Sequence, residues 1–198
     1  MIINFYINYK TYYEKILNNY EILNYECPKC GSKHAWVRHA TYERNVVLIE
    51  NEELVDVKMK ILRIKCTSCN STHAILPRDI IPYSIYSVSC ILKLISENYC
   101  DGNSVFCIAQ KYDISFQLIY NFLNRFLFII KECNNIFRIL EIVRGIFIPA
   151  PKEIIKILNN KFEKNNFSKI YARFNNWPFL MKKFRNIYPI PIYINFVY

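Results

Sequence analysis

Two cysteine pairs constrain this chain more than any other feature of its sequence. One pair is Cys27 and Cys30 and the other is Cys66 and Cys69, each with two residues between the thiols. A Cys-x-x-Cys turn directs both sulfurs at one point, and two such turns provide the four thiolates of a tetrahedral structural zinc site. We therefore predict that these cysteines bind one structural Zn²⁺. A rubredoxin-like iron site, which uses the same ligands, and disulfide bonds are the alternatives.

The residues around the two pairs support a metal site. Gly31 and Asn70 each follow the second cysteine of a pair, where the chain bends back and often needs a positive φ that Gly and Asn tolerate best. His34, His39 and His73 lie nearby, and either His34 or His73 could replace a cysteine as ligand, but four cysteines already complete a tetrahedral shell. We expect His73 to pack or form a hydrogen bond instead.

A β-hairpin is predicted between the pairs, which are separated by 35 residues. Apolar and β-branched residues favour strands over residues 35–48 and 55–65, with a polar turn at residues 50–53. The returning strand would bring the second pair beside the first. Four basic residues of this strand are candidates for phosphate contact or for a solvated face: Lys58, Lys60, Arg63 and Lys65.

The charge of the chain favours an anionic partner. The formal net charge is +10 and the isoelectric point is near 9.2, which points first to nucleic acid and otherwise to a basic surface kept for solubility. Residues 150–198 contain nine Lys or Arg and two Glu, interleaved with aromatic residues. This basic tail suits phosphate contact with base stacking, and solvated helix faces explain it equally well.

The expected location is the cytoplasm, with nucleoid association when DNA is bound. Residues 1–23 lack a signal-peptide pattern, and charged residues interrupt the apolar stretch 126–149, so we expect no membrane span. Thiols stay reduced in the cytoplasm, where paired cysteines bind metals rather than each other.

Helical periodicity appears before and after the cysteine pairs. We predict helices over residues 9–23, 84–98 and 104–112, with Ser84 or Ser87 capping the second of these. A further helix capped by Ser115 extends through Phe126 and beyond, followed by helices over residues 136–146 and 152–164. Four unpaired cysteines on or beside these helices are expected to be buried as small apolar residues: Cys90, Cys100, Cys107 and Cys133.

Residues 104–126 resemble the helix-turn-helix of bacterial repressors and transposases. Ala109 fits the small position where the two helices touch, and Ser115 fits the cap of the second helix. Asp113 occupies the turn position that is usually glycine, and aspartate can adopt the left-handed conformation at modest cost. Five apolar residues occupy the buried positions of such motifs, although a plain three-helix core would show the same spacing: Ile108, Tyr112, Ile114, Ile119 and Phe122.

If the motif is present, its geometry selects the side chains that face the major groove of DNA. Gln and Asn can contact adenine and Phe can contact a thymine methyl group, which would favour A·T-rich sites. The candidate DNA-binding residues are Ser115, Phe116, Gln117, Tyr120, Asn121, Asn124 and Arg125.

The whole arrangement, from residue 26 to residue 126, is similar to the amino-terminal DNA-recognition half of insertion-sequence transposases. It resembles more closely an uncharacterised bacterial family that joins a zinc ribbon to a helix-turn-helix. The Thr72–Pro77 exit from the ribbon and the Pro82-Tyr83-Ser84 step carry this likeness together with the cysteines. The resemblance implies double-stranded DNA as partner, with a homodimer or a regulatory or transposition protein as a further possibility.

We expect an α+β protein without enzymatic activity. A small zinc ribbon, built as a β-hairpin with two Cys-x-x-Cys knuckles, would be followed by a helix-turn-helix and a basic helical region. The boundaries would give an N-terminal helical segment (1–25), the ribbon (26–82), the helix-turn-helix (83–130) and the tail (131–198). No aspartate follows Asp113 to begin a nuclease triad. A protein-interaction adaptor and an RNA-binding module are the alternative functions.

Overall fold

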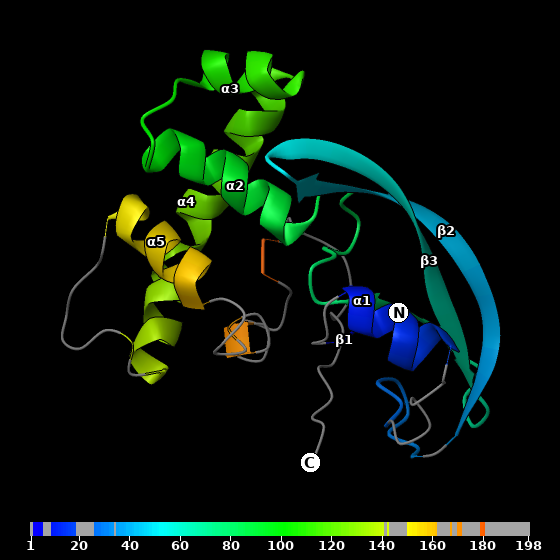
Figure 1. The fold of residues 1–198 in the computed structure, drawn as a ribbon. Helices are drawn as coiled ribbons and strands as arrows, with labels where there is room; N and C mark the ends of the chain where they lie inside the picture. The colour runs from blue at the N-terminus through cyan, green and yellow to red at the C-terminus, as the bar shows by residue number, and fades with distance from the viewer. Residues whose placement is uncertain are drawn as a thin grey trace.

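A long curved hairpin joins the two ends of this α+β fold (Figure 1). The computed structural model describes residues 2–5, 9–18, 26–33, 35–140, 142, 150–161, 167, 170–171 and 179–180. The cysteine pairs lie at the base of the hairpin and helices pack at its tip. No helix in these described ranges is long and apolar enough to cross a bilayer.

The predicted hairpin is confirmed as strands β2 (Trp36–Glu50) and β3 (Glu53–Cys66), which pair antiparallel. Asn51 and Glu52 join them, and both have positive φ (49° and 66°). A two-residue turn needs this conformation if its twist is to match that of the strands. The β2 strand bulges between Arg38 and Ala40, where its register with β3 shifts.

Two further strands complete a sheet in the order β1-β4-β3-β2. Strand β4 (Thr72–Pro77) pairs antiparallel with β3, and β1 (Ile2–Phe5) pairs parallel with β4. The sequence prediction missed both strands, because it assigned residues 1–25 to a helical segment and 72–77 to a ribbon exit. Pairing across such sequence distances leaves no local periodicity to read.

The helix predicted over residues 9–23 begins as α1 (Tyr9–Thr11) and continues as a π-helical turn, Tyr12–Asn18; residues 19–25 lie outside the described ranges. The segment lies on the concave side of the hairpin (Figure 1). Tyr12 Oη accepts the Leu62 N–H at 2.8 Å, and Tyr13 Oη accepts the Lys60 N–H at 3.1 Å. These hydroxyls satisfy edge donors of β3 near the point where its pairing with β4 ends.

The helices that follow begin at serine caps, which were predicted for the first and the third of them. They are α2 (Val88–Tyr99), α3 (Val105–Tyr112) and α4 (Phe116–Ile139). Ser87, rather than Ser84, caps α2, while Ser104 and Ser115 cap α3 and α4. In each case the serine side chain accepts the backbone N–H of the residue three positions later, which satisfies a donor that the helix leaves free.

The separate helix predicted over residues 136–146 is wrong at its start, because α4 continues without a break to Ile139. The apolar stripe of the first half of α4 continues at spacings of three or four residues, so one helix face serves the whole length. That stripe consists of Phe122, Phe126, Ile129, Cys133 and Phe137, all buried. Helix α4 therefore runs across the predicted boundary at residue 130. Residues 141 and 143–149 lie outside the described ranges.

The helix predicted over residues 152–164 is present as α5 (Pro151–Lys161). Pro151 occupies its first position, where the missing N–H costs no hydrogen bond. Residues 162–166 are outside the described part of the chain.

The tip of the hairpin is fixed to the helices by backbone bonds. The Val47 N–H donates to the Ile85 carbonyl at 2.7 Å, and the Ser87 N–H donates to the Val47 carbonyl at 3.0 Å. The Arg44 guanidinium donates to the carbonyls of Ile81, at 2.8 Å, and Ser84. Val47 also joins the apolar core of the helices, so the hairpin and the helices share one packed interface.

A buried carboxylate ties α2, α3 and the hairpin turn together. Glu97 is 2% exposed, and its Oε1 lies 2.7 Å from Lys111 Nζ and 3.7 Å from Lys93 Nζ. The Tyr112 hydroxyl also donates to Glu97, and Lys93 reaches Glu52 of the hairpin turn at 3.2 Å. Burial alone would raise the pKa of Glu97, but the hydrogen bonds from Lys111 and Tyr112 hold it below its ordinary value.

Replacing Glu97 with glutamine is expected to lower the free energy of unfolding at pH 7 by about 1–3 kcal/mol. Because the folded-state pKa is depressed, the carboxylate stabilises the fold above its unfolded pKa of about 4.3. That contribution is lost as pH falls through the folded-state pKa. Urea unfolding of the parent and of Glu97→Gln at pH 7 and pH 3 should show that their difference in free energy of unfolding shrinks in acid.

Glu52→Gln, at a side chain 74% exposed, is the control and should change stability by less than about 0.5 kcal/mol. A difference of equal size at both pH values would contradict the prediction.

Candidate functional site

The four paired cysteines converge at the base of the hairpin. Their sulfurs all lie within 4.8 Å of one another. The Cys27 and Cys69 sulfurs are 3.7 Å apart, as are those of Cys30 and Cys66. A tetrahedral site with metal–sulfur bonds of about 2.3 Å has sulfurs about 3.8 Å apart. The separation of the thiols therefore fits four ligands of one metal ion.

The two Cys-x-x-Cys turns have matching backbones. The Cys27 N–H donates to the Ser32 carbonyl and the Cys66 N–H donates to the Ser71 carbonyl, both at 2.9 Å. Gly31 and Asn70 have φ of 71° and 56°, as predicted. Each loop thus folds back five residues after its first cysteine and presents both sulfurs on the same side.

The thiols differ in their surroundings. Cys27 and Cys66 are buried, whereas Cys69 is partly exposed and Cys30 is exposed. Burial raises the pKa of the Cys27 thiol to about 12. Hydrogen bonds from the side chain and backbone of Ser71 lower the pKa of Cys69 to about 6, and the same contacts from Ser32 lower that of Cys30. The two more exposed thiols, Cys30 and Cys69, are thus predisposed to the thiolate form that metals bind.

The alternatives to a four-cysteine shell find no support among the described residues. All eight cysteines are free thiols, and 3.7 Å between sulfurs is far longer than a disulfide bond. His39 is exposed on β2, and His34 lies outside the described ranges.

His73 packs behind the cluster, as expected from the sequence. It is fully buried, its Nε2 lies 3.8 Å from Cys27 Sγ, and its ring stands edge-on to Trp36 with centroids 5.2 Å apart. Burial lowers the pKa of His73 to about 4, so the ring is neutral at pH 7. A neutral imidazole can donate one N–H to a cysteine sulfur without adding charge to the core.

Helix α3 and the start of α4 meet at the turn where Asp113 was expected to adopt a left-handed conformation. It does so, with φ 50° and ψ 48°, and its N–H donates to the Ala109 carbonyl. The residues predicted to lie between these helices are enclosed: Ile108, Ala109, Tyr112, Ile119 and Phe122 are buried and Ile114 is partly buried.

The candidate DNA-binding residues lie mostly on one exposed surface. Ser115, Phe116, Gln117, Tyr120, Asn121 and Asn124 are exposed, and from Gln117 onward they recur every three or four positions along α4, which places them on one helix face. Arg125 lies apart, because its guanidinium is half-buried and donates to the Leu180 carbonyl at 3.4 Å.

One residue of this surface was missed by the sequence reasoning. Phe106 in the first turn of α3 is 55% exposed and stacks on Phe116, with ring centroids 5.9 Å apart and planes at 16°. Only the packing of α3 against α4 brings Phe106 and Phe116 together.

The four unpaired cysteines differ in burial. Cys107, the neighbour of Phe106, is exposed, so the prediction that it is buried was wrong. Cys90 and Cys133 are buried and Cys100 is partly buried.

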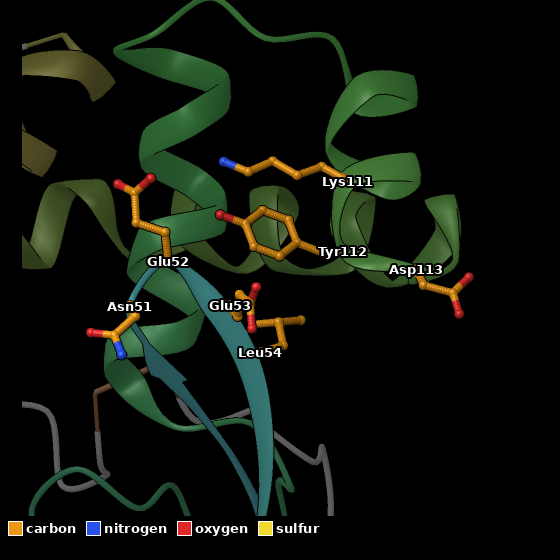
Figure 2. Close-up of a pocket in the computed structure, with 7 residues that line it drawn as sticks. All are labelled: Asn51, Glu52, Glu53, Leu54, Lys111, Tyr112 and Asp113. Atoms are coloured by element: carbon orange, nitrogen blue, oxygen red, sulfur yellow. The ribbon is translucent and has the colours of Figure 1, made fainter.

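A pocket of about 500 Å³ lies between the hairpin turn and the end of α3 (Figure 2). Asn51, Glu52, Glu53 and Leu54 line one side, and Lys111, Tyr112 and Asp113 line the other. Lys111 and Tyr112 extend in the same direction, whereas Asp113 points away (Figure 2). Lys111 and Tyr112 both bond Glu97, so their polar groups already serve the packing of α2 on α3.

The remaining basic candidates are dispersed. Lys58, Lys60 and Arg63 are exposed on β3 and Lys65 is partly buried; Arg63 lies 4.8 Å from the Tyr42 ring centre. In the basic tail, Lys152 and Lys156 are exposed on α5. Most of the other basic and aromatic residues of the tail lie outside the described ranges.

Comparison with known families gives one match, over slightly less than half of the chain. Residues 13–107 match the family described as a domain of unknown function (DUF6431). The match includes all four clustered cysteines, the whole hairpin and α2, and it ends in the first turn of α3. No curated protein and no solved structure matches the chain.

Proposed function

We propose that this protein binds double-stranded DNA through α3 and α4, and that a structural Zn²⁺ at the four cysteines maintains the hairpin on which these helices rest. The observation that carries the proposal is the α3–α4 unit. An eight-residue helix, a left-handed Asp113 and a serine-capped second helix are the parts that a helix-turn-helix requires, and the outer face of the second helix is exposed.

The metal part of the proposal rests on ligand type and spacing. Four thiolates at tetrahedral separations suit Zn²⁺, which is redox-inactive and binds four cysteines in structural sites. The chain supplies the ligands from the two turns, while His73 and Trp36 exclude water behind Cys27. Zinc would have no catalytic part in this arrangement, because four cysteines leave no open position for substrate.

The DNA part rests on the character of the α4 surface. From Ser115 to Lys131 the helix contains no Asp or Glu, so no carboxylate of α4 repels phosphate along this length. The exposed amides of Gln117, Asn121 and Asn124 provide donors and acceptors suited to base edges. In this proposal α3 lies over the sugar-phosphate backbone of the DNA, and the start of α4 enters the major groove.

Selection of duplexes from a random pool with zinc-loaded full-length chain, followed by mobility shift with salt titration, tests the proposal. We expect retardation at low salt and an affinity that falls linearly with the logarithm of salt concentration. Combined Gln117→Ala and Asn121→Ala should reduce discrimination between selected and random duplexes by about 5- to 150-fold, since a bidentate base contact contributes about 1–3 kcal/mol.

Asn135→Ala is the matched control, because Asn135 is exposed farther along the same helix. It should leave discrimination unchanged. Absence of retardation of any duplex at low salt by zinc-loaded protein would end the proposal.

A protein-interaction adaptor is the second candidate function. The observation that favours it is the set of exposed apolar side chains on α3 and α4: Phe106, Phe116, Leu127, Phe128 and Ile139. Partners that remain bound to the immobilised chain after nuclease treatment would favour an adaptor, and partners lost with the nucleic acid would favour DNA binding. RNA binding by the basic tail depends largely on residues outside the described ranges.

A further inference from the structure

An exposed aromatic pair stands at the beginning of α4. Phe106 is 55% exposed and Phe116 is 48% exposed, although both rings are large and apolar. Their planes are nearly parallel, at 16°, with ring centroids 5.9 Å apart, so the two rings lie side by side in an offset stack. The result is a fixed apolar ledge formed by two helices, and it contributes no side chain to the buried core.

Beside the ledge, two amides are linked. Gln117 Nε2 donates to Asn121 Oδ1 at 3.3 Å, one helical turn apart. This bond leaves the Gln117 carbonyl oxygen as an acceptor and the Asn121 amide nitrogen as a donor. The major-groove edge of adenine presents the complementary pair, an N6 donor and an N7 acceptor.

The charged residue nearest to this surface on α4 is turned away from it. Arginine and lysine are the usual readers of guanine, yet residues 115–124 contain neither. Arg125 donates to the Leu180 carbonyl, and Lys111 is bonded to Glu97. Within the described part of the chain, the surface therefore offers groups for adenine and an apolar ledge, but no cation of α4 positioned for guanine.

We propose that this surface selects A·T base pairs, with the Phe106–Phe116 ledge packing on the C5 methyl group of thymine and the Gln117–Asn121 pair bonding to adenine. The proposal rests on the DNA-binding function above and specifies its substrate. The thymine methyl is the apolar group of the major-groove edge, and burying it against two phenyl rings removes apolar surface from water. Phe106, which lies outside the second helix, becomes a specificity residue.

The test uses a duplex selected by the zinc-loaded full-length chain and the same duplex with every thymine of the site replaced by uracil. Uracil preserves the hydrogen-bonding edge and removes only the methyl group. Fluorescence anisotropy should show binding weakened by about three- to fivefold for each contacted methyl. Because the change is in the DNA, this comparison does not depend on the folding of a variant.

Variants then assign the effect to the ledge. Phe106→Ala and Phe116→Ala should each reduce the difference between the thymine and uracil duplexes while residual binding remains. Phe128→Ala, at a phenylalanine of α4 that is 63% exposed, is the matched control and should preserve the difference.

The outcomes separate the two proposals. Selected sites rich in G·C, or equal affinity for thymine and uracil duplexes in a chain that binds DNA, would overturn this inference and leave DNA binding intact. A chain that retards no duplex at low salt would overturn both.

Discussion

Replacing Cys27 with serine is expected to abolish tight metal binding and to unfold the base of the hairpin. Serine has nearly the same size, but its hydroxyl does not ionise to a ligand at neutral pH, so the tetrahedral shell loses a member. Binding of a structural zinc contributes on the order of 10 kcal/mol or more to folding, which is comparable with the whole stability of a small domain. Elemental analysis of the purified chain and thermal unfolding followed by circular dichroism would measure both effects.

Cys107→Ser is the matched control, because Cys107 is exposed on α3 and lies outside the four-cysteine cluster. It should retain one metal ion per chain and the unfolding midpoint of the parent. The same elemental analysis decides between zinc and iron. A Cys27→Ser chain with a full complement of metal and an unchanged midpoint would contradict the assignment of the ligands.

Replacing Phe122 with alanine is expected to lower the free energy of unfolding by about 3–5 kcal/mol. Phe122 is 1% exposed and lies in the core shared by the helices and the hairpin tip. Its ring contacts the Tyr86 ring edge-to-face, with centroids 5.3 Å apart. The truncation would therefore leave a cavity beside residues 85–87, which bond to Val47 of β2. Urea unfolding should show a lower midpoint with an unchanged slope.

Phe128→Ala provides the comparison on the same helix. This side chain is 63% exposed, and its loss should change stability by less than about 0.5 kcal/mol. Equal destabilisation by the two substitutions would contradict the burial of Phe122 at the interface between the helices and the hairpin.

Features encoded by neighbouring residues were predicted from the sequence. The spacing of the four cysteines indicated one metal site, and the structure brings their sulfurs within 4.8 Å. Ser104 and Ser115 were expected at the starts of helices and cap them there, while Asp113 adopts the left-handed conformation required at the turn. The caps and the turn depend on contacts within a few residues, which a linear sequence displays directly. The cysteine pairs are local motifs as well, and the hairpin between them brings the two together.

Other features depended on contacts that lie far away in the chain. The pattern after Lys131 was assigned to a new helix, yet α4 continues because Cys133 and Phe137 extend its buried face. Arg125 remains a predicted DNA contact, and its guanidinium donates to the Leu180 carbonyl, a partner that the sequence did not indicate. Cys107 was expected to be buried and is exposed.

The sequence by itself determined which four cysteines come together, where α2, α3 and α4 begin, and which residues form their apolar faces. Only the tertiary structure decided what those elements meet: Val47 of the hairpin with the segment before α2, Glu97 of α2 with Lys111 of α3, and Phe106 with Phe116. Caps and turns are stabilised by hydrogen bonds within a few residues. The larger assembly depends on burial and charge pairing between segments that become neighbours only when the chain has folded.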